Sequence, residues 1–135
     1  MKITSKAFES GEELPAKYTC DGKNVSPPLT IKDLPLKTQS LVLICEDPDA
    51  VGGTFIHWAI FNIPSDKTEI KEGEKFKSEC FNDFGGFGYK GPCPPAGNPH
   101  RYFFRLYALD TKLDFCWFPT TLAASLPSLN ISMVG

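Results

Sequence analysis

The chain has 135 residues, with 14 lysines and arginines against 16 aspartates and glutamates, and a formal net charge of −2. This length is typical of one domain with one hydrophobic core, and the scattered basic residues argue against a nucleic-acid-binding surface. No stretch reaches the about 18 apolar residues of a membrane-spanning helix, and the N-terminus lacks the apolar run of a signal peptide. We therefore expect a single cytoplasmic domain, residues 1–135.

The cysteines are five in number, an odd count in a chain without an export signal, so a disulfide framework is not expected. They are Cys20, Cys45, Cys80, Cys93 and Cys116. No C-x-x-C pair or Cys/His cluster is present, which argues against a zinc site. We expect reduced, mostly structural thiols and no cofactor.

Prolines and glycines, 12 and 11 of them, interrupt every stretch that has apolar residues at helical spacing. This distribution predicts a mostly-β fold. The main strand candidates are short apolar runs with turn signals between them, at Leu41–Cys45, His57–Ile63 and Arg101–Leu109. Asp21-Gly22 and Gly52-Gly53 are typical of tight turns.

The run HWAIFNI is apolar on both of its faces. Alternate residues from His57 to Ile63 form one face, and those from Trp58 to Asn62 form the other. A strand with two apolar faces is expected at the centre of a sheet, covered on both sides.

The C-terminal tail is unusual, because residues 115–135 contain no charged side chain. Two prolines prevent these residues from forming one uninterrupted spanning helix. We expect a last strand and a turn here, and regard residues 112–135 as an atypical ending of the domain.

The chain has only two histidines, and each opens one of the long apolar runs. His57 follows a glycine-rich turn, His100 follows a proline-rich loop, and the strand before them ends in Glu46-Asp47-Pro48-Asp49. If these strand ends converge, two imidazoles and several carboxylates line one cavity. Each element also has an ordinary structural role, since histidines at strand ends and Asp-Pro-Asp turns are common without any ligand.

Such a cavity is suited to three chemistries. Imidazoles oriented by a carboxylate, together with glycine N–H groups, can hold a small anion such as a phosphoryl group. Two histidines and two aspartates could bind a metal, although Asp-Pro-Asp presents its oxygens awkwardly. A thiol hydrolase would use Cys93 as nucleophile and His100 as base, but Cys93 lies between two prolines, far from a helix N-terminus that would lower its pKa. Anion binding is therefore favoured.

Three segments carry a family resemblance: CEDPDA at 45–50, GTFIHWAIFNIP at 53–64 and GPCPPAGNPHRYFFRLYALD at 91–110. They resemble the phosphatidylethanolamine-binding protein family, and more closely its bacterial and archaeal Raf-kinase-inhibitor-like branch. The likeness covers about residues 2–111. It implies a large antiparallel sheet packed with a smaller one, few peripheral helices, and a pocket for phosphate, phosphoryl head groups or similar anions.

The resemblance also implies which residues bind the ligand. The matching positions are Asp47, Asp49, His57, Gly91, His100 and Tyr102. Supporting positions are Pro48, Pro92 and Arg101, and no catalytic or metal-binding position is expected. In this arrangement His57 and His100 would donate to the anion, Asp47 would orient a ring and Arg101 would brace the loop.

Two departures from the family pattern are visible. Val51 stands where the motif usually has a proline, so one wall of the pocket is expected to be less rigid. Beyond Thr111 the charged C-terminal helix and final strand of the family are not recognisable, which indicates a divergent ending or a shifted reading frame. The function expected is a non-catalytic anion-binding protein that regulates a kinase or protease partner, with a homodimer left open. The alternative is a hydrolase that uses Cys93 and His100.

Overall fold

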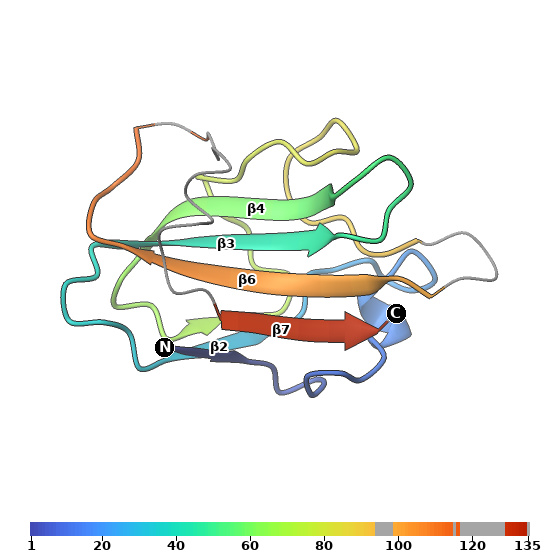
Figure 1. Cartoon of the computed structure of the whole chain (residues 1–135), viewed down its shortest axis with the longest axis horizontal. Helices are drawn as coiled ribbons and strands as arrows, with labels where there is room; N and C mark the ends of the chain where they lie inside the picture. Colours follow the sequence, from blue (N-terminus) through green and yellow to red (C-terminus); the bar gives the residue numbers. More distant parts are fainter. Residues whose placement is uncertain (94–98, 115, 117–128, 135) are drawn as a thin grey trace.

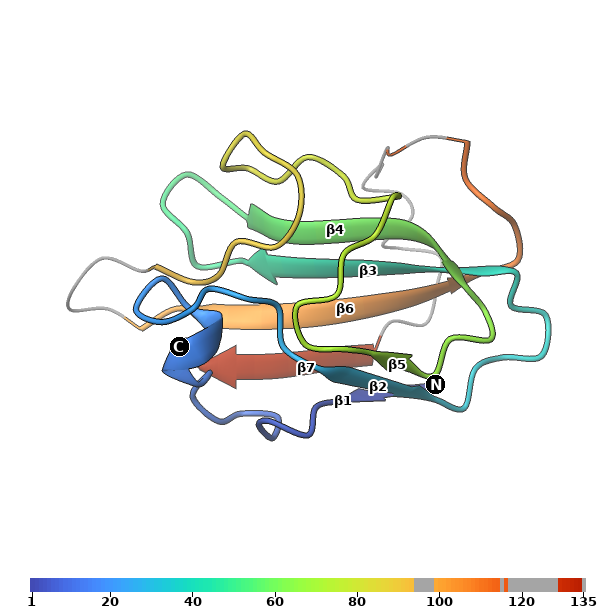
Figure 2. The same ribbon diagram turned by 180° about the vertical axis from the view of Figure 1, so that it is seen from behind.

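The computed structural model describes residues 1–93, 99–114, 116 and 129–134. In this part of the chain a large antiparallel sheet has the strand order β4-β3-β6-β7 (Figure 1), and a smaller one, β1-β2-β5, packs behind it (Figure 2). The predicted mostly-β fold of two packed sheets is confirmed. Helix is limited here to the 3₁₀ turn η1, Ala16–Tyr18, and no described helix has the length and apolarity to cross a membrane.

The small sheet contains β1 (Lys2–Thr4), β2 (Leu29–Lys32) and β5 (Glu69–Ile70). The large sheet contains β3 (Ser40–Asp47), β4 (Phe55–Pro64), β6 (Arg101–Leu109) and β7 (Leu129–Val134), so all three predicted strands are present. β3 pairs antiparallel with both β4 and β6. The C-terminal end of β3 and the N-terminal ends of β4 and β6 therefore lie together at one end of the sheet, on the right in Figure 1.

The position predicted for β4 is wrong, because this strand lies at the end of the sheet order and not at its centre. Its outer edge is covered by the irregular segment 78–83. The Cys80 N–H donates to the Ala59 carbonyl at 2.8 Å, and the Phe61 N–H donates to the Ser78 carbonyl at 3.1 Å. This segment also satisfies backbone groups that an exposed edge would leave unpaired. Two apolar faces therefore indicate that a strand is covered on both faces, but they do not show that it lies at the centre of the sheet.

The predicted faces of β4 are wrong at Ile63, because a β-bulge interrupts the alternation. Leu41 pairs with Ile63 but Leu43 pairs with Ile60, so β4 has one residue more than β3 in this interval. Asn62 adopts a positive φ of 51° there. Ile63 consequently points to the same side as Ile60, into the core between the sheets.

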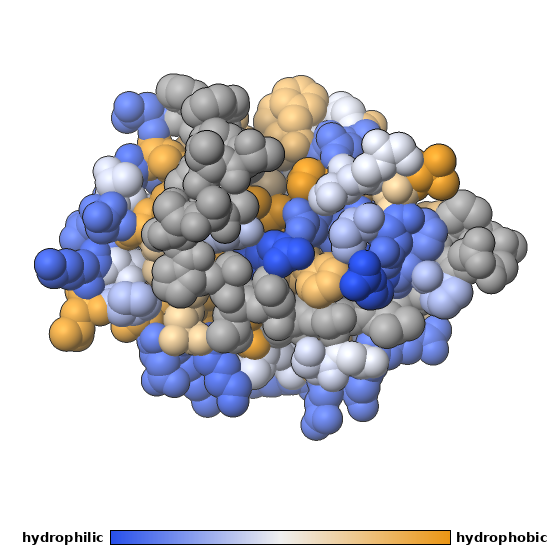
Figure 3. Space-filling view, viewed as in Figure 1, coloured by the Kyte–Doolittle hydropathy of each residue, from blue (hydrophilic) through white to orange (hydrophobic). Residues whose placement is uncertain are grey.

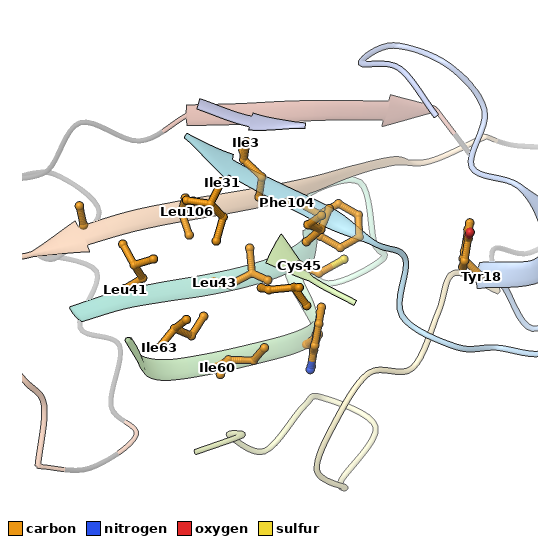
Figure 4. Close-up of a cluster of buried hydrophobic side chains, with 14 of the residues drawn as sticks. Ile3, Tyr18, Ile31, Leu41, Leu43, Cys45, Ile60, Ile63, Phe104 and Leu106 are labelled. Carbon is orange, nitrogen blue, oxygen red and sulfur yellow. The ribbon is translucent and has the colours of Figure 1, made fainter. Parts of the chain in front are cut away.

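The core between the two sheets is made of close-packed aliphatic and aromatic side chains (Figure 4). From the large sheet it includes Leu41, Leu43, Cys45, Ile60, Ile63, Phe104 and Leu106, and from the small sheet Ile3 and Ile31. A second cluster, with Val42 and Ile44, covers the other face of β3. Because close-packed interiors are rigid, the strand ends that carry Asp47, His57 and His100 rest on a fixed support.

The prediction of reduced thiols is wrong. Cys20 is bonded to Cys93 and Cys80 to Cys116, while Cys45 is free and buried in the core. The odd count misled because one cysteine packs as a small apolar residue and leaves four to pair. The paired residues are 73 and 36 positions apart, so no short motif marks either pair.

The expected last strand is present as β7, which pairs antiparallel with β6 from Arg101–Val134 to Leu106–Leu129. The rest of the predicted tail, residues 115, 117–128 and 135, lies outside the described residues. The alternatives of a divergent ending and a shifted frame stay open.

Candidate functional site

The end of β3 and the start of β6 bring Asp47 and His100 together. His100 Nδ1 lies 2.7 Å from Asp47 Oδ2, and both side chains are largely buried. Since the carboxylate accepts, Nδ1 carries the hydrogen and Nε2 is the ring nitrogen left for another partner. The second oxygen of Asp47 accepts from the Asp49 N–H at 2.8 Å. One carboxylate thus holds both the imidazole and the turn that follows β3.

His57 occupies a second bulge of β4. Cys45 pairs with Trp58 and Glu46 pairs with Ile56, so His57 is the extra residue between these two pairs. Bulges of this kind redirect a side chain, often beside a functional site. Sequence alternation alone does not reveal this bulge.

The His57 ring is only 4% exposed, and its Nδ1 lies 2.7 Å from the carbonyl oxygen of Lys90. A carbonyl can only accept, so Nδ1 carries the hydrogen here as well. Burial lowers the pKa of His57, although the Lys90 carbonyl and the charge of Asp47 act in the opposite direction. The neutral imidazole, with a lone pair on Nε2, is the favoured form at neutral pH.

Tyr102 connects the two imidazoles. Its ring centroid lies 5.3 Å from that of His57 and 6.5 Å from that of His100. Burial raises the pKa of the phenol, and the charge of Asp47 adds to this effect, so the hydroxyl stays protonated. Among the described residues the hydroxyl has no hydrogen-bond partner, yet no fully buried side-chain nitrogen or oxygen there is left without one. The hydroxyl oxygen is therefore only marginally accessible, since Tyr102 as a whole is 1% exposed.

Asp49 has a different role from Asp47. Its carboxylate accepts from the Arg101 N–H at 2.8 Å, from Nε at 2.9 Å and from Nη2 at 2.9 Å. These hydrogen bonds lower the pKa of Asp49 to about 2. Both oxygens of Asp49 are engaged by Arg101, which ties the turn containing Pro48 to the start of β6.

Gly91 occupies a position that only glycine fits. Its N–H donates to Asn24 Oδ1 at 2.7 Å, and a Cβ added to it would lie 2.1 Å from the carbonyl oxygen of Tyr18. The backbone thus approaches the segment 18–24 more closely than any side chain would allow. Lys90, which holds the His57 ring, is the residue just before this contact.

The segment after Gly91 is fixed to the same neighbour. The Cys20 N–H donates to the Pro92 carbonyl at 3.1 Å, and Cys20 and Cys93 form a disulfide. The hydrolase alternative with Cys93 and His100 is therefore wrong for this structure, since the sulfur is not a free thiol. Residues 94–98, the middle of the proline-rich loop, lie outside the described residues.

Val51 does not form a wall among the described residues. Its side chain is 97% exposed, in the turn between β3 and β4. No three His, Cys, Asp or Glu side chains of the described chain come together in a way that could hold a metal ion.

An open groove of about 530 Å³ lies over the small sheet, away from these histidines. It is lined in part by Lys6 and Lys67, which form ion pairs with Glu69 and Glu74. Its lining contains no imidazole or thiol, so it is a weaker candidate for a functional site than the strand ends that carry His57 and His100.

The family to which the chain belongs follows from its similarity to known proteins. A model described as "Phosphatidylethanolamine-binding protein" matches residues 4–131. The chain belongs to the phosphatidylethanolamine-binding protein family. This match confirms the resemblance found in the sequence and supports a role as a binding protein.

Relatives within this family come from archaea and bacteria. A UPF0098 protein of Methanothermobacter thermautotrophicus is 49% identical over 121 residues, which cover 84% of this chain and 80% of that protein. A UPF0098 protein of Archaeoglobus fulgidus is 53% identical over 116 residues, covering 80% of this chain but 40% of its own length.

Two crystal structures of phosphatidylethanolamine-binding protein homologues share the fold. One is the putative homologue CT736 from Chlamydia trachomatis, with a TM-score of 0.87, 34% identity, and 98% of this chain and 95% of that chain covered. The other is E. coli YbcL, with a TM-score of 0.84, 29% identity, and 98% and 96% covered.

Sequence reasoning missed several residues of this family member's candidate site. Asn24 and Lys90 act through one polar backbone or side-chain atom each, and they come from segments without a recognisable motif. Phe55 and Phe84 pack against the His57 ring, with centroids 5.2 Å away in both cases. The cluster of three phenylalanines in FNDFGGF was the one available signal, because so many exposed aromatics in a glycine-rich turn are unusual.

Proposed function

We propose that this chain is a non-catalytic binding protein for phosphate or a phosphoryl-type anion, held by His57, His100 and Tyr102. One observation carries the proposal. Nδ1 of each ring is held by an internal acceptor, the Lys90 carbonyl for His57 and Asp47 for His100, which leaves Nε2 as the ring nitrogen that can face a ligand. Ordered polar groups without internal partners are typical of a site prepared for a ligand.

The expected ligand is an anion because of the protonation states. Each Nε2 accepts while its ring is neutral and donates once the ring is protonated. An anion bound there requires a proton on Nε2 or a P–OH group that donates to it. Binding is therefore coupled to proton uptake, and affinity falls as pH rises through the histidine range.

Neither Cys93 nor Cys45 is available as an activated nucleophile. Cys93 is in a disulfide, and Cys45 is buried, with burial raising the pKa of its thiol far above the usual range. A binding role needs neither thiol.

The test is calorimetric titration of inorganic phosphate and phosphorylethanolamine into the wild type, His57→Ala and His100→Ala. Loss of a hydrogen bond to a charged group should weaken binding about tenfold to a hundredfold in each variant. Lys32→Ala, which removes a cation on the small sheet, is the control and should bind like the wild type. Repeating the titration in buffers of different ionisation enthalpy measures the proton uptake. Unchanged affinity in both histidine variants would refute the site.

The remaining expectations extend this proposal. A kinase or protease partner rests on the name of the family branch alone, and a homodimer is open to sedimentation analysis. One domain over residues 1–135 is supported by the core that the two sheets share in the described part of the chain. The cytoplasmic location stays a prediction, and the two disulfides count against a reducing compartment. Cell fractionation with antibody detection would decide it.

A further inference from the structure

A hairpin beside the candidate site, residues 81–87, exposes three phenylalanines. Phe81 is 62% exposed, Phe84 40% and Phe87 65%, an unusual density of large apolar side chains on one short turn. Apolar side chains stand out at the upper edge of the molecule in Figure 3, where Figure 1 draws part of the segment between β5 and β6. Phe81 and Phe87 pair with each other, with ring centroids 4.1 Å apart.

The hairpin is held in one conformation by Asn82. The Asn82 Oδ1 accepts from the N–H groups of Phe84 at 2.9 Å and Gly86 at 3.2 Å. Its Nδ2 donates to the Gly88 carbonyl at 3.0 Å, and Asn82 itself is buried. The backbone that carries Phe84 is thus ordered before any ligand arrives.

The hairpin is also attached to the strand that carries His57. The Asp83 N–H donates to the Ile56 carbonyl at 2.9 Å, and the Ile56 N–H donates to Asp83 Oδ2 at 2.6 Å. These two hydrogen bonds fix Asp83, the neighbour of Phe84, to Ile56, the residue before His57.

Phe84 is the phenylalanine that reaches the site. Its ring centroid lies 5.2 Å from that of His57 and 4.8 Å from that of Phe55. The Lys90 ammonium lies 4.8 Å from the centre of the Phe84 ring. One exposed aromatic ring therefore contacts an imidazole of the site and carries a cation above it.

We propose that the site takes phosphate monoesters whose esterified group is aromatic, and that Phe84 selects this group. The inference rests on the proposed anion site. With the phosphoryl group at His57, the group esterified to it extends past the ring that packs against that histidine. An aromatic group can pack against the exposed part of Phe84, beside the Lys90 ammonium, and little ordering entropy is lost because the hairpin is already fixed. Lys90 adds positive charge beside the dianion.

The experiment compares inorganic phosphate, methyl phosphate and phenyl phosphate by calorimetric titration of the full chain. Methyl phosphate matches the charge of phenyl phosphate and lacks the ring. We expect phenyl phosphate to bind about fivefold more tightly than methyl phosphate, as expected for an added aromatic pair. Phe84→Ala should abolish this preference. Phe87→Ala is the control, because it removes another exposed phenylalanine of the same hairpin that makes no ring contact with His57, and it should keep the preference.

The outcomes separate the two proposals. Equal affinities for methyl and phenyl phosphate in the wild type would overturn the inference and leave the anion site intact. A preference that survives in Phe84→Ala would overturn the role of Phe84. If none of the three compounds binds, both proposals are wrong. The wild-type comparison needs no variant, so the inference can be refuted even if Phe84→Ala does not fold.

Discussion

The middle of the large sheet and the end that carries the candidate site are built from the same three strands. In the middle, Leu43 pairs with Ile60 and with Leu106, and none of these side chains is accessible to solvent. At that end of the sheet, the same strands contribute Asp47, His57 and Tyr102. Regular pairing produces the close packing, whereas the bulge at His57 and the turn after Asp47 turn polar groups toward one another. Core packing and the candidate site thus occupy different parts of each strand.

The largest effect is expected from Leu43→Ala, which creates a cavity in the middle of the sheet. We expect a loss of about 2–5 kcal/mol in the free energy of unfolding, measured by urea denaturation. Phosphate affinity of the folded protein should be unchanged, since the strand ends keep their pairing. A loss below about 1 kcal/mol would show that the core collapses around the cavity and is not a rigid support.

The two disulfides should contribute equally to stability but differently to the candidate site. Removing either pair, by Cys20→Ser with Cys93→Ser or by Cys80→Ser with Cys116→Ser, should cost about 2–4 kcal/mol. Only the first pair should also weaken phosphate binding, because it fixes the segment that contains Gly91. The same change in affinity for both pairs would contradict this distinction.

His57 should make stability depend on pH. Burial lowers the pKa of His57 in the folded chain below the usual 6.5, so the unfolded chain binds more protons between these two values. Stability is fully present above pH 6.5 and is lost as pH falls toward the folded pKa, by at most about 1.4 kcal/mol per pH unit. His57→Gln should flatten this dependence in urea titrations from pH 7.5 to about 5. An identical slope would mean that another group titrates.

The smallest effect on stability is expected from Arg101→Ala, at the start of β6. The Arg101 side chain is more than half exposed, and ion pairs of this kind contribute little in water. The urea midpoint should shift by no more than the scatter of repeated measurements. A clear fall in the midpoint would show that the brace to Asp49 stabilises this end of the sheet more than its exposure suggests.

The sequence predicted the sheet better than the site. The runs around Leu43, Ile60 and Phe104 are apolar in themselves, so local composition indicated all three strands and which ends carry polar groups. The bulges could not be predicted, because a single residue with positive φ or one extra residue leaves no periodic signal. The face of Ile63 was assigned wrongly for this reason.

By itself, the sequence determined the mostly-β class, the three main strands and the family, because these depend on local patterns and on the order of motifs. Only the tertiary structure decided that Cys20 meets Cys93, that Asn24 holds Gly91, and that Phe84 packs against His57. Each of these contacts joins residues that are far apart in the chain. Their geometry depends on how the two sheets pack and where β4 is bulged, and no stretch of sequence encodes that locally.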